Sequence, residues 1–290
     1  MIKNKKLIIC LTGEPRSFHK GLLSREKIIS KKIFKNVESR YHISFIKESK
    51  RKEVSKIMKA IKSFSKDSSL KNLRIEKNSC DNIWLNLLKQ KLLILEDLKN
   101  EDNNLENSII LLTRTDWLFT KNCINLIDDS VKKRKIVTPY LTDIINEYKN
   151  KKYKPIFDQF MVIPGEFIGG VIESLRIACE LFVAKNNNTT KKNLKLPGDG
   201  LNRYGIPPEK ALGIGFLLSG AVNNFHTDDN FKFAFKPGIY NTSDHNLIRD
   251  DAHIWMNLSF KDLFIKYLLF SSDNTLSRIK SITKFLKKNN

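Results

Sequence analysis

The stretch that decides the fold reads Ser108-Ile109-Ile110-Leu111-Leu112-Thr113-Arg114-Thr115-Asp116-Trp117-Leu118-Phe119. It begins as an unbroken apolar run, which is typical of a strand buried on both faces in the middle of a parallel sheet. Two opposite charges, Arg114 and Asp116, follow at the carboxyl end of this strand, where open α/β sheets bind their ligands. A carboxylate there can hold a metal ion or a sugar hydroxyl, and an arginine can hold a phosphate. The alternative is an ion pair that only caps the strand.

Strand-like and helix-like segments alternate through the first half of the chain. Buried strands are predicted at 7–11, 41–46, 72–77, 108–113 and 135–139, and helices at 22–34, 54–64, 84–95 and 124–131. This alternation indicates a parallel sheet with helices on both faces. The second half predicts a basic loop at 148–155, a strand at 157–163, a helix at 166–184, a polar loop at 186–200, a helix from 207, a strand at 231–235, and helices at 260–268 and 276–286. The predicted class is therefore α/β, with a mostly parallel central sheet and helices at the C-terminus.

The chain of 290 residues is strongly basic, with 52 Lys and Arg against 31 Asp and Glu and a net charge of +21. A charge of this sign favours polyanionic partners, namely nucleic acid, an anionic membrane surface or phosphorylated substrates. The basic clusters are scattered along the sequence, which is more typical of solvated loops than of one groove. A nucleic-acid-binding protein without catalysis is therefore a second hypothesis, and the sequence carries no helix-turn-helix, OB-fold or RNA-recognition signature in its support.

Four cysteines stand far apart, at positions 10, 80, 123 and 179, and none forms a CxxC pair. This pattern favours buried, reduced thiols over a disulfide framework or a zinc site. The N-terminal residues lead directly into a strand, and no apolar stretch is long enough to span a bilayer. We therefore expect a cytoplasmic protein.

Three short motifs carry residues suited to chemistry. In Thr12-Gly13-Glu14-Pro15-Arg16-Ser17, a turn between a strand and a helix, backbone N–H groups and Arg16 could hold a diphosphate. In Phe157-Asp158-Gln159-Phe160 the rings are expected to pack while the polar pair faces solvent or a cleft, and Asp158 could bind sugar hydroxyls or act as a base. Pro208-Glu209 places an acid in the first turn of a helix. The structural alternatives are a plain βα turn, a strand-entry turn and an ordinary helix start.

The order of these motifs resembles that of a diffuse group of bacterial and viral surface-polysaccharide glycosyltransferases. The group opens with a Ser/Thr-Gly-x-x-Arg turn, as at 12–16, followed here by a helix with Gln90. It carries Arg-x-Asp-Leu at the end of a central strand, to which Arg-Thr-Asp-Trp-Leu at 114–118 is similar. An Asp-Gln-Phe segment, as at 158–160, and a Pro-Glu pair before a late helix, as at 208–209, complete the order. The resemblance spans about residues 7–225.

The resemblance implies a GT-A-like fold and the transfer of a sugar from a nucleotide-diphospho-sugar donor to a glycan or lipid-linked acceptor, of capsule, O-antigen or lipopolysaccharide type. It implies a donor-binding half at 1–140 and an acceptor side of the same domain at 141–255, and the residue pattern adds basic amphipathic helices at 256–290. The implied donor contacts are Thr12, Gly13, Arg16, Arg114, Asp116 and Gln159, and the implied catalytic acids are Asp158, as the base, and Glu209.

The metal requirement stays open because Arg114 stands where related enzymes carry the first acid of Asp-x-Asp. The resemblance puts Asp116 at the metal position. Either Mn²⁺ or Mg²⁺ binds through Asp116 and the diphosphate, or Arg114 takes the place of the ion. Three histidines, at 226, 245 and 253, offer ligand types, but their spacing matches no metal motif.

The predicted C-terminal helices combine apolar stripes with flanking lysines and arginines. Such helices can lie peripherally on the anionic inner face of a membrane, where lipid-linked acceptors are found; the alternative is ordinary docking onto the core. A nucleic-acid partner is not expected. A third hypothesis is another nucleotide-using α/β enzyme, such as a nucleotidyltransferase, which shares the fold class and the first loop.

Overall fold

The computed structural model describes residues 5–13, 34, 36–45, 70–77, 83–102, 104–115, 117–119, 123–139, 141, 144–186, 206–228, 233–235 and 247–249. Several sequence predictions lie outside these residues. They are the helix at 22–34 up to its last residue, the helix at 54–64, the polar loop at 186–200 beyond its first residue, and the C-terminal helices at 260–268 and 276–286.

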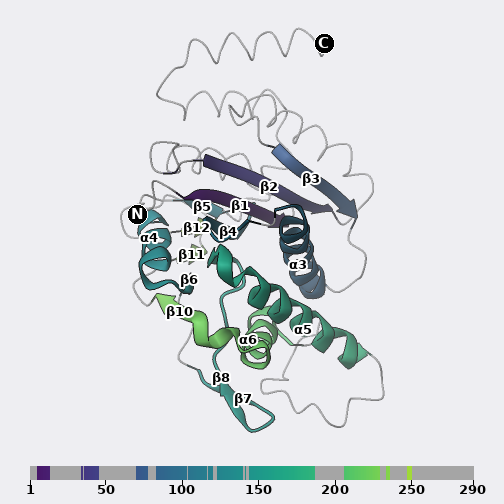
Figure 1. Ribbon diagram of the computed structural model, residues 1–290. Coiled ribbons are helices and arrows are strands. Elements are labelled where there is room, and N and C mark those ends of the chain that lie inside the picture. The colour runs from purple at the N-terminus through teal and green to yellow at the C-terminus, as the bar shows by residue number, and fades with distance from the viewer. Residues whose placement is uncertain are drawn as a thin grey trace.

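A seven-stranded sheet forms the centre of the described chain (Figure 1). Its strand order is β10-β6-β9-β4-β1-β2-β3. The strands are β1 (Lys6–Gly13), β2 (Asn36–Phe45), β3 (Leu70–Lys77), β4 (Ser108–Arg114), β6 (Ile136–Pro139), β9 (Phe160–Pro164) and β10 (Phe225–Asp228). Strands β3, β2, β1 and β4 are mutually parallel, β10 is parallel to β6, and β9 is antiparallel to both β4 and β6. The predicted mostly parallel sheet is confirmed.

The neighbours of β4 differ in part from the sequence prediction. All seven of its residues are buried, as its apolar run predicts, but only β1 pairs with it in parallel. Its other neighbour, β9, is antiparallel. Burial of both faces shows in the sequence, whereas strand direction depends on whether a helical crossover precedes the strand.

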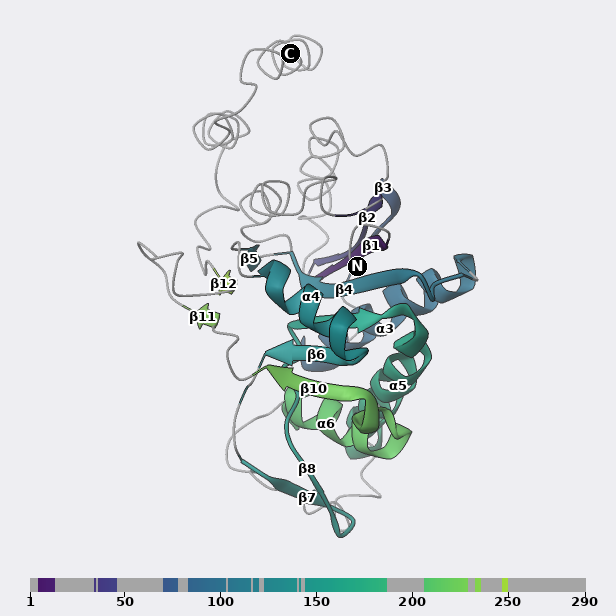
Figure 2. The ribbon, with the colours of Figure 1, turned by 60° about the vertical axis from the view of Figure 1, so that its left-hand side comes forward.

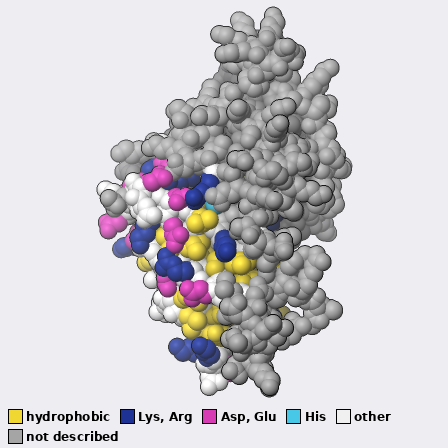
Figure 3. All heavy atoms as spheres, turned by 90° about the vertical axis from the view of Figure 1, so that its right-hand side faces the viewer, with side chains coloured by type: hydrophobic (Ala, Val, Ile, Leu, Met, Phe, Trp, Pro, Cys, Tyr) yellow, Lys and Arg dark blue, Asp and Glu magenta, His cyan; other side chains and the backbone are white. Residues whose placement is uncertain are grey.

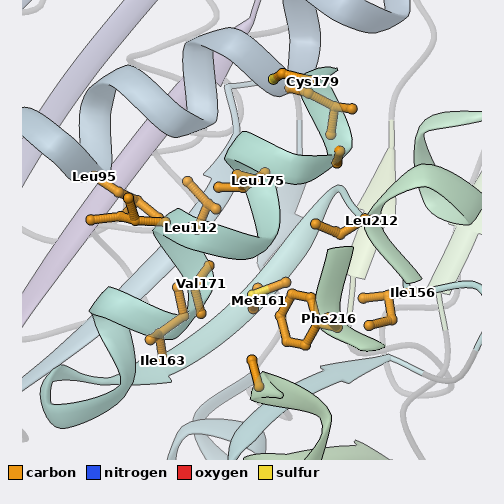
Figure 4. Close-up of a cluster of buried hydrophobic side chains, with 14 of the residues drawn as sticks. Leu95, Leu112, Ile156, Met161, Ile163, Val171, Leu175, Cys179, Leu212 and Phe216 are labelled. Carbon is orange, nitrogen blue, oxygen red and sulfur yellow. The ribbon is translucent and has the colours of Figure 1, made fainter. Parts of the chain in front are cut away.

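Helices cover both faces of the sheet. On one face lie α3 (Ile83–Glu101), α5 (Ile168–Asn186) and α6 (Pro208–Ser219), packed on side chains that include Ile8 and Cys10 of β1. On the other face lies α4 (Cys123–Lys133), in a second core cluster with alternate β1 residues such as Ile9. Figure 4 shows the first cluster, where Leu112 of β4 and Met161 of β9 lie among side chains of the three helices.

Two smaller sheets complete the described architecture. Strand β5 (Trp117–Phe119) pairs with β12 (Leu247–Arg249), which pairs in turn with β11 (Phe233–Phe235). A hairpin is formed by β7 (Asn146–Tyr148) and β8 (Lys151–Tyr153), and short 3-10 helices η3 (Gly165–Phe167) and η5 (Ala221–Asn224) follow later. The predicted loop at 148–155 is therefore wrong, because these short, mostly polar strands lack the apolar alternation by which strands are recognised.

Other sequence predictions can be checked on the described residues. Three cysteines, Cys10, Cys123 and Cys179, are free and buried, and burial raises the pKa of the Cys10 and Cys179 thiols to about 12. The fourth lies outside the described residues. No helix within the described ranges is both long and apolar enough to cross a membrane.

Close contact between α5 and α6 depends on Gly215. A Cβ atom at this position would lie 2.1 Å from the carbonyl oxygen of Ser174 in α5, so Gly215→Ala is expected to destabilise the fold by about 1–3 kcal/mol. Gly169→Ala is a matched control, since a Cβ there meets only the Nζ of Lys99, at 3.5 Å. It is expected to change the stability by less than about 1 kcal/mol. Urea unfolding measures both, and equal stabilities would contradict this packing.

Candidate functional site

The candidate site lies at the carboxyl edge of the parallel strands. In the β1–β4 ladder Thr12 is the partner of Arg114, the last residue of β4. In the β4–β9 ladder Thr113 is the partner of Phe160, the first residue of β9. Because β9 is antiparallel, it starts where β4 ends, and Asp158 and Gln159 immediately precede it. The structure therefore brings Thr12 and Gly13 at the end of β1, the end of β4 and the Asp-Gln-Phe segment to one edge.

Hydrogen bonds join these three segments. The Thr12 hydroxyl donates to the Thr113 carbonyl at 3.5 Å, and the Thr115 N–H donates to the Thr12 carbonyl at 3.2 Å. The Thr113 hydroxyl donates to the Gln159 carbonyl at 3.4 Å. Since Thr12 and Thr113 are fully buried, their hydroxyls hold the edge together.

Gly13 gives this edge its backbone shape. Its φ of +103° lies in a region that residues with a side chain rarely adopt, and no described atom comes within 4 Å of the position of a Cβ. A glycine therefore suits this position at the end of β1, and no described side chain crowds it. This is the place where the sequence predicts a diphosphate.

Asp158 is held by a lysine. Its Oδ2 forms an ion pair with the Nζ of Lys91 on α3, and the two side chains are only 2% and 1% exposed. The expectation that the polar pair faces solvent or a cleft is therefore wrong for Asp158, whereas Gln159 is partly exposed. A buried carboxylate is costly unless a cation compensates it, and Lys91 supplies that charge from the neighbouring helix.

Sequence reasoning missed Lys91 as a site residue. It stands at helical spacing from Leu88 and Leu95, both fully buried, so its position belongs to the apolar stripe of α3. A lysine at such a position is the signal that could have identified it, because a buried cation requires a partner. Gln90, the preceding residue, is also buried, and its side-chain oxygen has no hydrogen-bond partner among the described residues.

Glu209 lies against the same ion pair. It stands in the first turn of α6, and its carbonyl accepts a hydrogen bond from the Ile156 N–H at 3.0 Å. Burial, together with the charge of Asp158 and a hydrogen bond to it, raises the pKa of Glu209 to about 7, although Lys91 opposes this shift. The two predicted acids therefore form one cluster with Lys91.

Glu209 is partly protonated near neutral pH because its pKa is raised to about 7. Asp158 Oδ1 is buried and has no hydrogen-bond partner among the described residues. Two neighbouring carboxylates repel each other when both are ionised, so the charge of Asp158 adds to burial in favouring the protonated form of Glu209. Glu209 therefore titrates in the pH range where acid–base catalysis is most effective.

A second buried charge cluster behaves in the opposite way. In β2, Glu38 accepts from Lys6 at 2.9 Å and from Arg40 at 2.7 Å, and Arg40 also donates to Glu101 at 2.9 Å. Burial acts to raise the pKa of Glu38, but the Lys6 hydrogen bond and the Arg40 charge outweigh it and lower this pKa. Glu38 is thus a compensated carboxylate with a lowered pKa, whereas the pKa of Glu209 is raised.

Two predicted site residues, Arg16 and Asp116, lie outside the described residues, so their contacts stay predictions. Within the described ranges, no group of three or more His, Cys, Asp or Glu side chains is arranged to hold a metal ion. Asp158 and Glu209 do not fit a divalent cation either, because Lys91 already compensates the charge of Asp158 and burial raises the pKa of Glu209. Of the C-terminal histidines considered as metal ligands, at 226, 245 and 253, only His226 is described. Its Nε2 lies 3.1 Å from the Nζ of Lys133.

Comparisons with known proteins give only distant likeness. No family model and no curated protein sequence matches the chain. Among solved structures, an active-site mutant of LgtC has a TM-score of 0.46 at 7% identity. The match covers 90% of this chain and 94% of the LgtC chain. The apo WbbM bifunctional glycosyltransferase has a TM-score of 0.46 at 8% identity, covering 97% of this chain, which spans 52% of WbbM. A glycosyltransferase involved in glycosylation of the major capsid of PBCV-1 has a TM-score of 0.37 at 11% identity. The match covers 90% of this chain and 99% of that glycosyltransferase chain. At these identities the likeness concerns the backbone arrangement alone.

Proposed function

We propose that the chain is a GT-A-like glycosyltransferase that moves a sugar from a nucleotide-diphospho-sugar donor to a surface glycan or a lipid-linked saccharide. The observation that carries the proposal is the cluster of Lys91, Asp158 and Glu209 beside the carboxyl edge formed by Thr12 and Arg114. Open α/β sheets bind nucleotides at this edge, and direct attack of an acceptor hydroxyl on the sugar is helped by a base next to it.

In the proposed reaction Glu209 is the group that exchanges a proton. It is partly exposed, whereas Asp158 is fully buried, so Glu209 is better placed to reach an acceptor hydroxyl. The ionised form of Glu209 accepts the hydroxyl proton as the oxygen attacks the anomeric carbon. Asp158, fixed by Lys91, keeps the affinity of Glu209 for protons high enough for this step.

Arg114 is the proposed binding group for the diphosphate. It ends β4 and is only 8% exposed, so its position is fixed. A guanidinium presents forked donors that match phosphate oxygens, and it stays charged as the nucleoside diphosphate leaves. The backbone at Gly13 faces the same edge. A divalent cation, if one takes part, would depend on Asp116.

A thermal-shift screen of nucleoside diphosphates, with and without Mn²⁺, tests the binding part of this proposal. A ligand present at about 100 times its Kd stabilises the folded state by about 2.7 kcal/mol, which corresponds to a rise in Tm of several degrees for a chain of this size. At least one nucleoside diphosphate is expected to give such a rise.

Matched substitutions locate the binding. Arg114→Lys keeps the charge but loses the fork, so it is expected to weaken nucleotide binding by about tenfold. Arg176→Lys on the exposed side of α5 is the control and is expected to leave binding unchanged. If no nucleoside diphosphate shifts the Tm, or if only nucleoside triphosphates do, the transferase assignment is wrong.

A further inference from the structure

The β7–β8 hairpin projects from the described part of the molecule. Its two-residue turn, Lys149 and Asn150, has φ values of 49° and 64°, the left-handed pair of a type I′ turn, which matches the twist of hairpin strands. Figures 1 and 2 show the hairpin at the end of the molecule farthest from β2 and β3, extending beyond α6.

Exposed lysines dominate the hairpin. Lys149, Lys151 and Lys152 are exposed, and none of them forms an ion pair with a described acidic side chain. Lys149 instead lies over the ring of Tyr148, 5.4 Å from its centroid. The exposed lysines of α4 differ, because Lys132 and Lys133 each pair with an aspartate one helical turn away. Figure 3 shows basic side chains at the lower end of the described surface, at the height of the hairpin.

Two isoleucines adjoin these lysines. Ile144 and Ile145, which directly precede β7, are 64% and 60% exposed and are the most exposed large hydrophobic residues in the described part of the chain. Exposing two neighbouring apolar side chains to water is unfavourable. The cost is recovered when they enter an apolar medium.

We propose that Ile144, Ile145 and the β7–β8 hairpin form a docking surface for an anionic phospholipid bilayer. Lysines bind the charged headgroups, and the isoleucines insert into the boundary between headgroups and acyl chains. Nucleic acid would satisfy the lysines but leave both isoleucines in water. The combination of the two side-chain types therefore favours a lipid surface.

The docking surface is firmly connected to the candidate site. The chain leaves β8 and reaches Asp158 within five residues, and on the way the Ile156 N–H binds the Glu209 carbonyl. The same segment packs closely on α6, because a Cβ on Gly213 would lie 2.5 Å from the Lys154 carbonyl oxygen. The link to the acceptor rests on the proposed function. In that case a lipid-linked acceptor would reach Glu209 from the bilayer to which the protein is bound.

Vesicle co-sedimentation of the full chain tests the docking surface. The protein is expected to bind vesicles of phosphatidylglycerol and phosphatidylcholine and to bind phosphatidylcholine vesicles much more weakly. The triple variant Lys149→Gln, Lys151→Gln, Lys152→Gln is expected to lose roughly 100-fold in partitioning, since each lysine near an anionic surface contributes about fivefold. For the double variant Ile144→Ser, Ile145→Ser, partitioning to the vesicles is expected to decrease by roughly tenfold or more.

The control variant Lys99→Gln, Lys132→Gln, Lys133→Gln changes the net charge by the same amount on exposed helix positions. Its partitioning to the vesicles is expected to decrease by less than about threefold. The proposal is overturned if the hairpin variant binds as tightly as this control. It is also overturned if the isoleucine variant binds like the unaltered protein, which would indicate a site for soluble polyanions. The nucleotide screen contains no lipid, so failure of the docking surface and failure of the proposed function are separate results.

Discussion

Glu209→Gln is expected to lower donor turnover by about 10²–10⁴-fold while the protein stays folded. The glutamine amide has the shape of the protonated acid and can still donate a hydrogen bond to Asp158, but it cannot accept a proton from an acceptor hydroxyl. The measurement is kcat for release of the nucleoside diphosphate, with the donor selected by the thermal-shift screen. Glu180→Gln, at an exposed position of α5, is the control and is expected to retain full activity.

The same variant has a stability readout that does not depend on the substrate. The pKa of Glu209 is about 7 in the folded state and about 4.3 in an unfolded chain. Between these values the folded state holds a proton that the unfolded state has lost, so stability decreases as the pH rises from about 4 to about 7. Glutamine does not ionise and avoids this loss. Glu209→Gln is therefore expected to exceed the unaltered protein in stability by on the order of 1–3 kcal/mol above neutral pH, and to match it near pH 4. A constant difference across this range would contradict the raised pKa of Glu209.

Lys91→Met is expected to destabilise the fold by about 3–5 kcal/mol, the largest loss of stability predicted for this chain. The substitution preserves most of the side-chain volume in α3, but it leaves Asp158 as a buried charge without a cation, since both partners are at most 2% exposed. Chemical unfolding at neutral pH measures the loss.

A double variant separates charge from packing. Adding Asp158→Asn to Lys91→Met removes the uncompensated charge, so most of the lost stability is expected to return. Lys89→Met, at a partly exposed position of the same helix, is the control and is expected to change the stability by less than about 0.5 kcal/mol. If Lys91→Met costs no more than this control, or if the double variant stays as unstable as the single one, the ion pair does not compensate a buried charge.

The sequence predicts the parts of the fold that hydrophobic patterns encode. The apolar run of β4 and the strand of β1 are recognisable because both faces of the sheet are covered by helices. Strand β10 and the β7–β8 hairpin were not predicted, because short strands with lysine, histidine or aspartate carry no such pattern. The antiparallel direction of β9 follows from the path of the chain between strands, which no local pattern records.

The sequence predicted the acids of the candidate site, but it did not identify the cation, Lys91. Asp158 and Glu209 were both identified as candidate acids, and the structure brings them into contact although 51 positions separate them. The raised pKa of Glu209 was not predictable, because it depends on burial and on the nearness of Asp158. Lys91 was counted in an amphipathic helix, where spacing alone does not distinguish a buried lysine from an exposed one. The assigned roles of Thr12, Gly13, Arg114 and Gln159 in donor binding stay predictions.

The central claim is that the carboxyl edge of β1 and β4 binds a nucleotide-diphospho-sugar next to the acid pair. A crystal structure of the protein with the nucleotide-diphospho-sugar that raises its Tm most is the most direct test. We predict that the diphosphate lies beside Gly13 and Arg114 and that the sugar points toward Gln159 and Glu209. A nucleotide bound elsewhere, with Glu209 out of reach of the sugar, would contradict the claim.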